Sequence, residues 1–503
     1  MRHYDWLAYH ARTRPDAPCW TDLHSERDFT YGEAEDRCRR LAAHLQRACG
    51  VKRGDRVAVL AMNSTDVMEV HSACAKIGAI FLPLNWRLVA AEIDFIVSDS
   101  APQVLIHDGA TKEIVDGLTV SLPHVIETTG GGAPSAFEDA IAASYGDFAA
   151  EEMSHDDTWT IMYTSGTTGR PKGAPNTYAM AFWNAINLGV PARVSRESTC
   201  VTVLPLFHTG GLNCFATPIL HAGGRNLVMR AFDPGQLLGL IDDPKWGVTH
   251  FLGVPANYLF MSQHPAFAET DFSRIQSASV GGAPTPVPLL ETYKIKNIAI
   301  TQGFGMTETS PCVSLQTPQD AWAKPGSAGR CILHGELKVV REDGADAAPD
   351  EIGELWVKGA NITPGYWNRP EANAKEFVDG WFKTGDAARL DPDGDLWIVD
   401  RWKDMYISGG ENVYPAEVEN TLFALDGVAD GAIVGVPDQK WGEVGVAFVV
   451  KGEGATLTED DVLGWFHGKV ARFKMPTRAI FLDELPRNAT GKVLKRVLRD
   501  QVA

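Results

Sequence analysis

The chain has 503 residues, of which 45% are hydrophobic and 22% charged, a composition typical of a globular protein with more than one domain. Its formal net charge of −18 argues against a nucleic-acid-binding function, because non-specific binding to nucleic acid needs a basic surface. No run of about 18 apolar residues predicts a membrane span, and Met1–Trp6 is not an apolar signal segment. The eight cysteines form no Cys-x-x-Cys pair, so we expect reduced thiols and a cytoplasmic location.

The first part of the chain alternates between predicted helices and strands. Residues 5–48 are expected to form a helix, a break and a second helix. Strands are then predicted over residues 56–60, 79–83 and 103–107, with helical segments over 67–78 and 90–98 between them. Strands that alternate with helices in this way indicate a parallel sheet.

A phosphate-binding loop is predicted directly after the strand 159–163. The loop residues suited to an anion are Thr164, Ser165, Gly166, Thr167, Thr168, Gly169, Arg170 and Lys172. Glycines let the backbone N–H groups face an anion, hydroxyls donate hydrogen bonds, and Lys172 adds a positive charge. The loop is not of the Walker A type, because Gly173 stands where a magnesium-binding hydroxyl would follow the lysine.

The middle of the chain offers candidates for a substrate pocket. The helix predicted over 179–188 places Met180, Trp183, Asn184 and Asn187 on one face. His208 follows the strand 201–205 and precedes two glycines, and ligands of α/β folds are found at such strand ends. Phe251 and Val254 belong to the segment 249–255. For Trp183, Phe251 and Val254, a position in the core is an equally good interpretation.

The last part of the chain contains further motifs. Gln302–Glu308 reads Gln-Gly-Phe-Gly-Met-Thr-Glu, and Gly380–Asp386 ends in a carboxylate suited to ribose hydroxyls. From residue 404 a smaller α+β unit is expected, with helices over 417–425 and 458–469 and a strand over 431–437. Its final segment is rich in Lys and Arg, which suggests an anionic partner.

These motifs resemble those of the AMP-forming adenylating enzymes, which include acyl-CoA synthetases, luciferases and the adenylation domains of peptide synthetases. The resemblance extends over nearly the whole chain and implies an α/β fold. It implies a large N-terminal domain of layered α/β subdomains with a β-rich segment, residues 1–402. A small, mobile α+β domain would follow over residues 403–503.

The resemblance also implies the nucleotide site. The loop 164–172 would bind the phosphates of ATP, with Gly282, Ala283 and Pro284 at the adenine. Phe304 stands where the family usually has Tyr, so it keeps a stacking face but loses the hydroxyl. Thr307 would bind the α-phosphate and Glu308 would hold Mg²⁺. Asp386 and Arg401 would contact the ribose.

The other implied residues serve the acid, the hinge and the thiol. Trp183, His208, Phe251, Val254 and Gly281 would form the acyl pocket, with His208 at the carboxylate. Lys403 falls on the hinge, and Lys492 would be the catalytic lysine carried by the small domain. The candidates for binding CoA are Gly409, Gly410, Trp441, Arg472, Phe473 and Lys474.

The expected activity is that of an ATP- and CoA-dependent acyl-CoA synthetase that acts on small-molecule acids through an acyl-adenylate. A medium- or long-chain fatty acid is favoured, and an aromatic acid of the feruloyl, hydroxycinnamoyl or benzoyl type is the alternative. A carrier-protein acceptor, a luciferase-type oxidation and a catalytically silent nucleotide-binding protein are the rival interpretations. A homodimer is one assembly that we consider.

Overall fold

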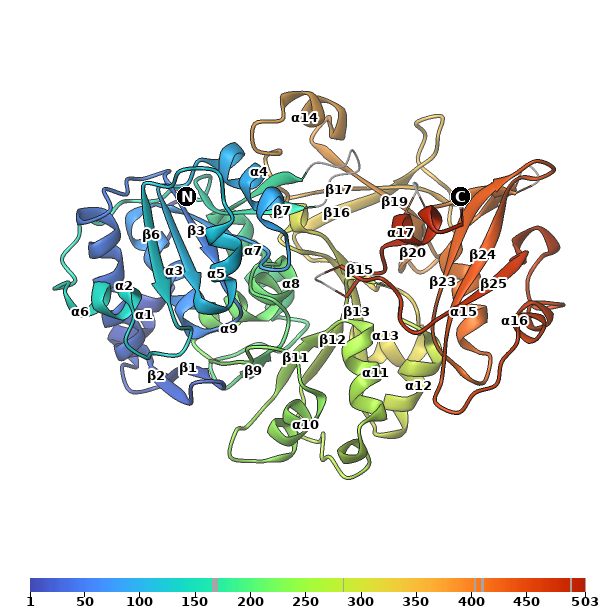
Figure 1. The fold of residues 1–503 in the computed structure, drawn as a ribbon, viewed down its shortest axis with the longest axis horizontal. Helices are drawn as coiled ribbons and strands as arrows, with labels where there is room; N and C mark the ends of the chain where they lie inside the picture. Colours follow the sequence, from blue (N-terminus) through green and yellow to red (C-terminus); the bar gives the residue numbers. More distant parts are fainter. Residues whose placement is uncertain (165–170, 284, 402–403, 409–410, 489–490, 503) are drawn as a thin grey trace.

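The computed structural model describes residues 1–502 except 165–170, 284, 402–403, 409–410 and 489–490, and only the backbone of Arg401 and Asn412. It contains a large N-terminal body and a smaller C-terminal unit that lies beside it (Figure 1). The predicted fold class, mixed α/β with a large and a small domain, is therefore confirmed. The predicted boundary between residues 402 and 403 lies outside the described residues.

The first sheet has six strands in the order β6-β5-β3-β4-β7-β8, parallel except for the antiparallel pair β7 and β8. Its strands are β3 (Arg56–Leu60), β4 (Ile80–Pro83), β5 (Val104–Asp108), β6 (His124–Thr128), β7 (Thr158–Thr164) and β8 (Lys172–Thr177). The helical segments of this part of the chain are α2 (Tyr31–Arg47), α3 (Thr65–Ile77), α4 (Ala90–Ser100), η1 (Gly109–Thr111), α5 (Lys112–Asp116) and α6 (Ala136–Ala142). The predicted parallel sheet is thus present, and the candidate phosphate loop joins β7 to β8.

The second sheet has nine strands in the order β15-β14-β13-β12-β11-β9-β10-β1-β2. They are β1 (Pro18–Asp22), β2 (Arg27–Thr30), β9 (Thr199–Thr202), β10 (Arg225–Val228), β11 (His250–Gly253), β12 (Ser277–Val280), β13 (Ile300–Gly305), β14 (Cys312–Leu315) and β15 (Arg330–Cys331). The break predicted between the first two helices contains β1 and β2. β1 pairs with β2, which follows it in the chain, and with β10, which is distant in the chain. The sequence analysis missed both strands, because the pairing that joins them to the sheet is not local.

The helical segments that accompany the second sheet include one π-helical stretch, η2. They are α1 (Trp6–Thr13), α7 (Tyr178–Gly189), α8 (Thr209–Gly211), η2 (Leu212–Ala216), α9 (Thr217–Ala222), α10 (Pro234–Asp242), α11 (Pro255–Gln263), η3 (Pro265–Ala268), α12 (Val287–Ile295), η4 (Thr307–Thr309) and α13 (Pro318–Ala323). The helix predicted over 179–188 is therefore confirmed as α7.

The β-rich segment forms a third sheet in the order β16-β17-β19-β18, with β20 paired to β19. It comprises β16 (Gly335–Val340), β17 (Gly353–Gly359), β18 (Phe377–Val378), β19 (Trp381–Leu390) and β20 (Leu396–Arg401), with α14 (Pro370–Glu376) before β18. All of its strand pairs are antiparallel.

The small domain has a fourth sheet in the order β22-β21-β24-β23, with β25 paired to β24. Its elements are β21 (Tyr406–Ser408), β22 (Glu411–Val413), α15 (Pro415–Phe423), β23 (Val428–Asp438), β24 (Gly442–Lys451), α16 (Glu459–Trp465), η5 (Arg472–Lys474), β25 (Arg478–Leu482) and α17 (Lys495–Asp500). In β23, Ala432 and Val434 pack in one hydrophobic cluster and Ile433 in another. Because alternate residues of a strand face opposite sides, this sheet buries both of its faces.

Among the described residues, no helix combines the length and the apolarity that a membrane crossing requires.

An aromatic cluster with histidines ties the N-terminal segment to the first sheet. The ring of His71 stacks on Trp159 at 4.2 Å, and Trp159 stacks on Tyr178 at 5.0 Å. The ring of His3 lies 4.2 Å from that of Tyr178. Burial lowers the pKa of His71 to about 3 and that of His3 to about 4. Both imidazoles are therefore neutral in the folded protein at neutral pH.

This cluster predicts a loss of stability in acid. The unfolded chain takes up protons on these histidines near pH 6.5, so their contribution to stability is complete above that pH and is lost as pH falls toward 4. Between pH 7.5 and 5, the free energy of unfolding should fall by about 2 kcal/mol less in His71→Phe than in the unchanged protein. Urea unfolding followed by tryptophan fluorescence measures this, with the exposed His24→Phe as control; an equal loss in the His71 variant would contradict the assignment.

Gly305 marks a close approach between β13 and the segment before β14. A Cβ placed on Gly305 would overlap the carbonyl oxygen of Pro311, to which Met306 donates its backbone N–H at 3.2 Å. Only glycine fits between these two backbones.

Gly305→Ala should therefore lower the stability of the large domain by about 1–3 kcal/mol, because the backbone of Pro311 has to move. Gly239→Ala is the matched control, since Gly239 lies inside α10 and a Cβ there meets nothing within 4 Å. That control should raise stability by up to about 1 kcal/mol. Thermal melting compares the two, and a Gly305 variant as stable as the unchanged protein would show that the close contact is absent.

Candidate active site

A cavity of about 1540 Å³ lies between the large and the small domain. The large domain lines it with Gly282, Ala283, Phe304 and Asp386, and the small domain with Phe473 and Lys492, among others. The cavity thus brings together residues that the sequence analysis assigned to one nucleotide site.

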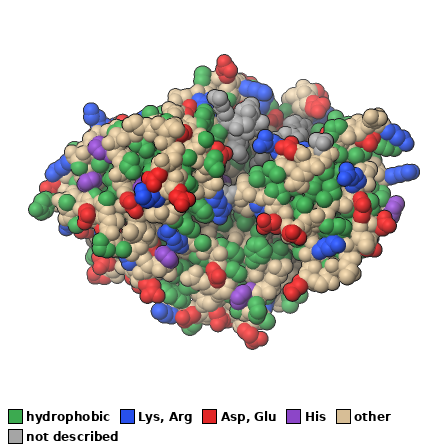
Figure 2. All heavy atoms as spheres, viewed as in Figure 1, with side chains coloured by type: hydrophobic (Ala, Val, Ile, Leu, Met, Phe, Trp, Pro, Cys, Tyr) green, Lys and Arg blue, Asp and Glu red, His purple; other side chains and the backbone are tan. Residues whose placement is uncertain are grey.

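Acidic and basic side chains are interspersed over the face of the molecule in Figure 2.

The cavity wall that carries the predicted nucleotide contacts Gly282 and Phe304, which we call the nucleotide wall, lies at the ends of β12 and β13. Gly282 follows β12 with a φ of 81°, a conformation that favours glycine. Phe304 is half-buried in β13 and faces the cavity. Asp386 is 9% exposed and lies opposite the backbone of Arg401 in the register of β19 and β20. Of the other predicted nucleotide contacts, Pro284 and the side chain of Arg401 lie outside the description.

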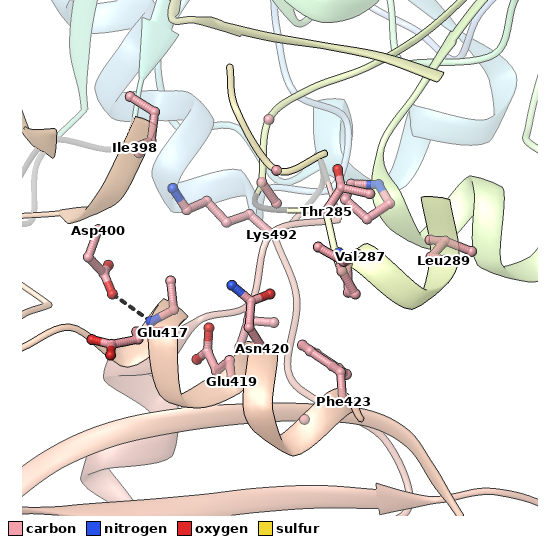
Figure 3. A pocket seen from close by; sticks show the side chains of 18 of the residues that line it. Thr285, Val287, Leu289, Ile398, Asp400, Glu417, Glu419, Asn420, Phe423 and Lys492 are labelled. Atoms are coloured by element: carbon pink, nitrogen blue, oxygen red, sulfur yellow. Dashed lines mark hydrogen bonds between the residues drawn. The ribbon is translucent and has the colours of Figure 1, made fainter. Parts of the chain in front are cut away.

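Lys492 enters the cavity from the small domain. Its side chain extends into the space that Thr285 and Ile398 of the large domain also line (Figure 3). The backbone N–H of Lys492 donates to Asn488 Oδ1 at 2.9 Å, and a Cβ on Gly491 would lie 3.2 Å from Val254 Cγ2. The loop that carries the lysine therefore touches the large domain.

A second link between the domains also lies beside the cavity. The backbone N–H of Ala416, in the first turn of α15, donates to Asp400 Oδ2 at 3.0 Å (Figure 3). Lys495 and Glu419 form an ion pair of 2.8 Å beside it. Burial, helped by the charge of Asp400, raises the pKa of Glu419. Burial opposes a rise in the pKa of Lys495, but the carboxylates of Glu419 and Asp400 raise it.

The candidate phosphate loop is described only at its two ends. Thr164 Oγ1 donates to the carbonyl oxygen of Lys172 at 3.4 Å. Lys172 Nζ lies 2.8 Å from Glu376 Oε1 and 3.9 Å from the centre of the Tyr366 ring. The loop residues between, Ser165, Gly166, Thr167, Thr168, Gly169 and Arg170, lie outside the described residues.

Glu308 is a buried carboxylate next to this lysine. Tyr366 donates its hydroxyl to Glu308 Oε1 at 2.8 Å, and both residues are 5% exposed. Burial raises the pKa of Glu308. Thr307 lies in the same short turn, η4, and its carbonyl oxygen accepts from Asn176 at 3.2 Å. A carboxylate beside the predicted phosphate loop fits Mg²⁺, which is commonly bound by one or two carboxylates together with phosphate oxygens.

Tyr366 is a site residue that the sequence analysis did not assign. It belongs to the segment Gly365–Pro370, whose residues suggested no chemistry by themselves. Its contacts with Glu308 and Lys172 join residues that are far apart in the chain, so only the fold shows them.

The candidate acyl residues do not all share one environment. His208 Nδ1 accepts the backbone N–H of Gly210 at 3.1 Å, and burial lowers the pKa of His208 to about 4. The ring is therefore neutral at pH 7, with its proton on Nε2. Val254 and Gly281 lie at the nucleotide wall, whereas the ring of Trp183 packs at 4.8 Å from that of His334.

Phe251 occupies the core. It is 1% exposed and its ring lies 5.3 Å from that of Tyr258 within the cluster behind the second sheet. This is the core position that the sequence left open as the alternative for Phe251.

Of the candidates for CoA, Trp441 and Arg472 are exposed on the small domain, whereas Phe473 and Lys474 line the interdomain cavity. Trp441 is 46% exposed, with Lys440 Nζ 4.9 Å from its ring centre. Lys474 Nζ pairs with Glu417 at 2.7 Å, and Phe473 packs against the small domain's core. Arg472 is exposed beside them. The hinge candidate Lys403 and the glycines Gly409 and Gly410 lie outside the described residues.

Two family models match the chain. The model described as AMP-binding enzyme covers residues 7–367, and the model described as AMP-binding enzyme C-terminal domain covers residues 417–492. The two matches fall on the large and the small domain respectively.

Individual relatives extend this match over nearly the whole chain. A feruloyl-CoA synthase of Amycolatopsis sp is 39% identical, covering 98% of both chains. An indoleacetate–CoA ligase of Aromatoleum aromaticum is 37% identical over 100% of this chain and 98% of the relative. A long-chain-fatty-acid–CoA ligase of Mycobacterium tuberculosis is 35% identical over 100% of this chain and 99% of the relative.

A solved structure shows the same architecture. ATP-bound MatB from Rhodopseudomonas palustris aligns with a TM-score of 0.91 at 32% identity, covering 99% of this chain and 98% of that one. Fold, motifs and relatives agree: the chain belongs to the AMP-binding enzyme family and is an AMP-forming acyl-CoA synthetase.

Proposed function

We propose that the interdomain cavity is where this synthetase joins its acid to AMP. The observation that supports this most strongly is the position of Lys492, which comes from the small domain and lines the same cavity as Phe304 and Asp386. A cationic side chain beside the nucleotide wall suits a reaction in which negative charge builds up on the α-phosphate.

In the first half-reaction, a carboxylate oxygen of the acid attacks the α-phosphorus of ATP and pyrophosphate leaves in line. Such a step depends mainly on placement and charge neutralisation. Lys492 would bridge the carboxylate and the α-phosphate, while Arg170 and Lys172 hold the β- and γ-phosphates. Glu308 would hold Mg²⁺, which supplies further neutralisation of the phosphates when bound.

In the second half-reaction, the thiolate of CoA attacks the acyl carbon and AMP leaves. We propose that the small domain turns about Lys403 between the two steps, so that Gly409 and Gly410 line the path of the pantetheine. Trp441, Arg472, Phe473 and Lys474 are our candidates for the nucleotide end of CoA. The arrangement described above, with Lys492 in the cavity, suits the first step.

For the acid, we propose an aromatic carboxylate with a short side arm. Two relatives, at 39% and 37% identity, are a feruloyl-CoA synthase and an indoleacetate–CoA ligase, whereas the long-chain fatty-acid ligase is 35% identical. The rings of the acyl-pocket candidate Trp183 and of His334 beside it would suit a flat substrate ring. The fatty acid favoured by the sequence analysis is the competing candidate.

The cytoplasmic location and the homodimer stay predictions. Fractionation of cells tests the first, and light scattering of the purified protein tests the second.

Lys492→Ala should separate the two half-reactions. Loss of the bridging charge should slow acyl-adenylate formation by about 10²–10³-fold, while CoA transfer from a supplied acyl-adenylate changes little. Pyrophosphate exchange and thioester formation measure the two steps. Lys112→Ala, which removes an exposed lysine paired with Asp116, should change neither. Equal loss of both steps in the Lys492 variant would refute its role.

A panel of acids tests the substrate class. Pyrophosphate release should give a kcat/KM at least tenfold higher for ferulic, cinnamic or indoleacetic acid than for octanoic or palmitic acid, because a difference of about 1.4 kcal/mol in transition-state binding is a factor of ten. A preference for the fatty acids would restore the original prediction and overturn the aromatic proposal.

A further inference from the structure

The ion pair between Lys172 and Glu376 lies at the triphosphate end of the site. We propose that Glu376 is a counter-ion that competes with the phosphates of ATP for Lys172, and so limits the affinity of the enzyme for ATP and pyrophosphate. This inference rests on the proposed function, because it takes the loop before Lys172 as the phosphate site.

The geometry holds the ammonium group of Lys172 between two groups. Glu376 Oε1 lies 2.8 Å from Nζ, and the ring of Tyr366 lies 3.9 Å from it. The Lys172 side chain is 14% exposed and that of Glu376 is 27% exposed. An ion pair this sheltered is screened less by salt than one on the open surface.

Glu376 reaches this position because the segment before it is fixed to β8. Trp367 donates its backbone N–H to the carbonyl oxygen of Gly173 at 2.8 Å. Thr363 Oγ1 donates to the carbonyl oxygen of Pro175 at 2.7 Å. These bonds hold the segment 363–367 against the strand that begins with Lys172.

The helix α14 is attached to the same segment. Asn373 Oδ1 accepts the backbone N–H of Tyr366 at 2.7 Å, and Asn373 Nδ2 donates to the Tyr366 carbonyl oxygen at 3.1 Å. Glu376 is the last residue of α14, where the helix dipole disfavours a carboxylate. The charge of Lys172 offsets this unfavourable position.

A carboxylate in this place has a consequence for nucleotide binding. Lys172 carries one charge, so the β- and γ-phosphates must either displace Glu376 or bind next to its negative charge. Both outcomes weaken the hold on a triphosphate and on free pyrophosphate. AMP lacks these phosphates and should not be affected. The enzyme would release pyrophosphate faster but would bind ATP less tightly.

An ordinary structural ion pair would behave differently. Its removal would lower the stability of the enzyme without distinguishing between AMP and ATP. If Glu376 instead positioned Lys172 for the phosphates, its neutralisation would weaken ATP binding. The sign of the change and its dependence on the ligand therefore separate these roles.

The test is calorimetric titration of the full-length enzyme and of Glu376→Gln with ATP, pyrophosphate and AMP, each with magnesium present. Glutamine keeps the shape of the side chain and removes its charge. We expect ATP and pyrophosphate to bind roughly three- to tenfold more tightly to the variant, in the range of a partly sheltered ion pair, with AMP binding unchanged. Glu371→Gln, which removes an equal charge from the exposed first turn of α14, should shift none of the three.

Unchanged or weaker binding of ATP and pyrophosphate by Glu376→Gln would overturn the inference, and so would an equal change for AMP. In each of these cases the unchanged enzyme still binds ATP, so the proposed function stands. Failure of the unchanged enzyme to bind ATP would contradict both.

Discussion

The contact between the Lys492 loop and the nucleotide wall is the constraint on which the site depends. Gly491, with a φ of 81°, brings its backbone against Val254, and a Cβ on Gly282 would meet the same valine at 3.6 Å. Val254 therefore lies between the loop of the small domain and the turn of the large one. Together with the bond from Ala416 to Asp400, this contact joins the two domains beside the cavity.

Two titratable groups of the predicted site, His208 and Glu308, have different uses. Burial lowers the pKa of His208 and leaves it a neutral ring with a donor on Nε2, so it can orient a carboxylate without adding a charge. Burial raises the pKa of Glu308, while the hydroxyl of Tyr366 and the charge of Lys172 oppose that rise. The first arrangement suits an acid that must remain nucleophilic, and the second suits a ligand for a cation.

Local patterns made much of the fold predictable. The alternating strands of the first sheet and the helix α7 were found because their periodicity is local. Gly282, Phe304 and Lys492 were proposed for the site because each belongs to a recognisable motif, and in the structure they line one cavity. Tyr366 and Glu376 were not assigned, because their roles come from contacts with Lys172 and Glu308, which are distant in the sequence. For Phe251 the sequence left both a pocket and a core position open, since strand periodicity does not distinguish a core face from a pocket wall.

The transfer of oxygen from the acid to AMP tests the central claim most directly. An acid labelled with ¹⁸O in its carboxylate is converted with ATP and CoA, and the nucleotide product is analysed by mass spectrometry. If the carboxylate attacks the α-phosphorus, the product is AMP with one labelled oxygen, because the acyl carbon–oxygen bond breaks when the thiol attacks. Formation of ADP, or of AMP without the label, would contradict an acyl-adenylate in this cavity.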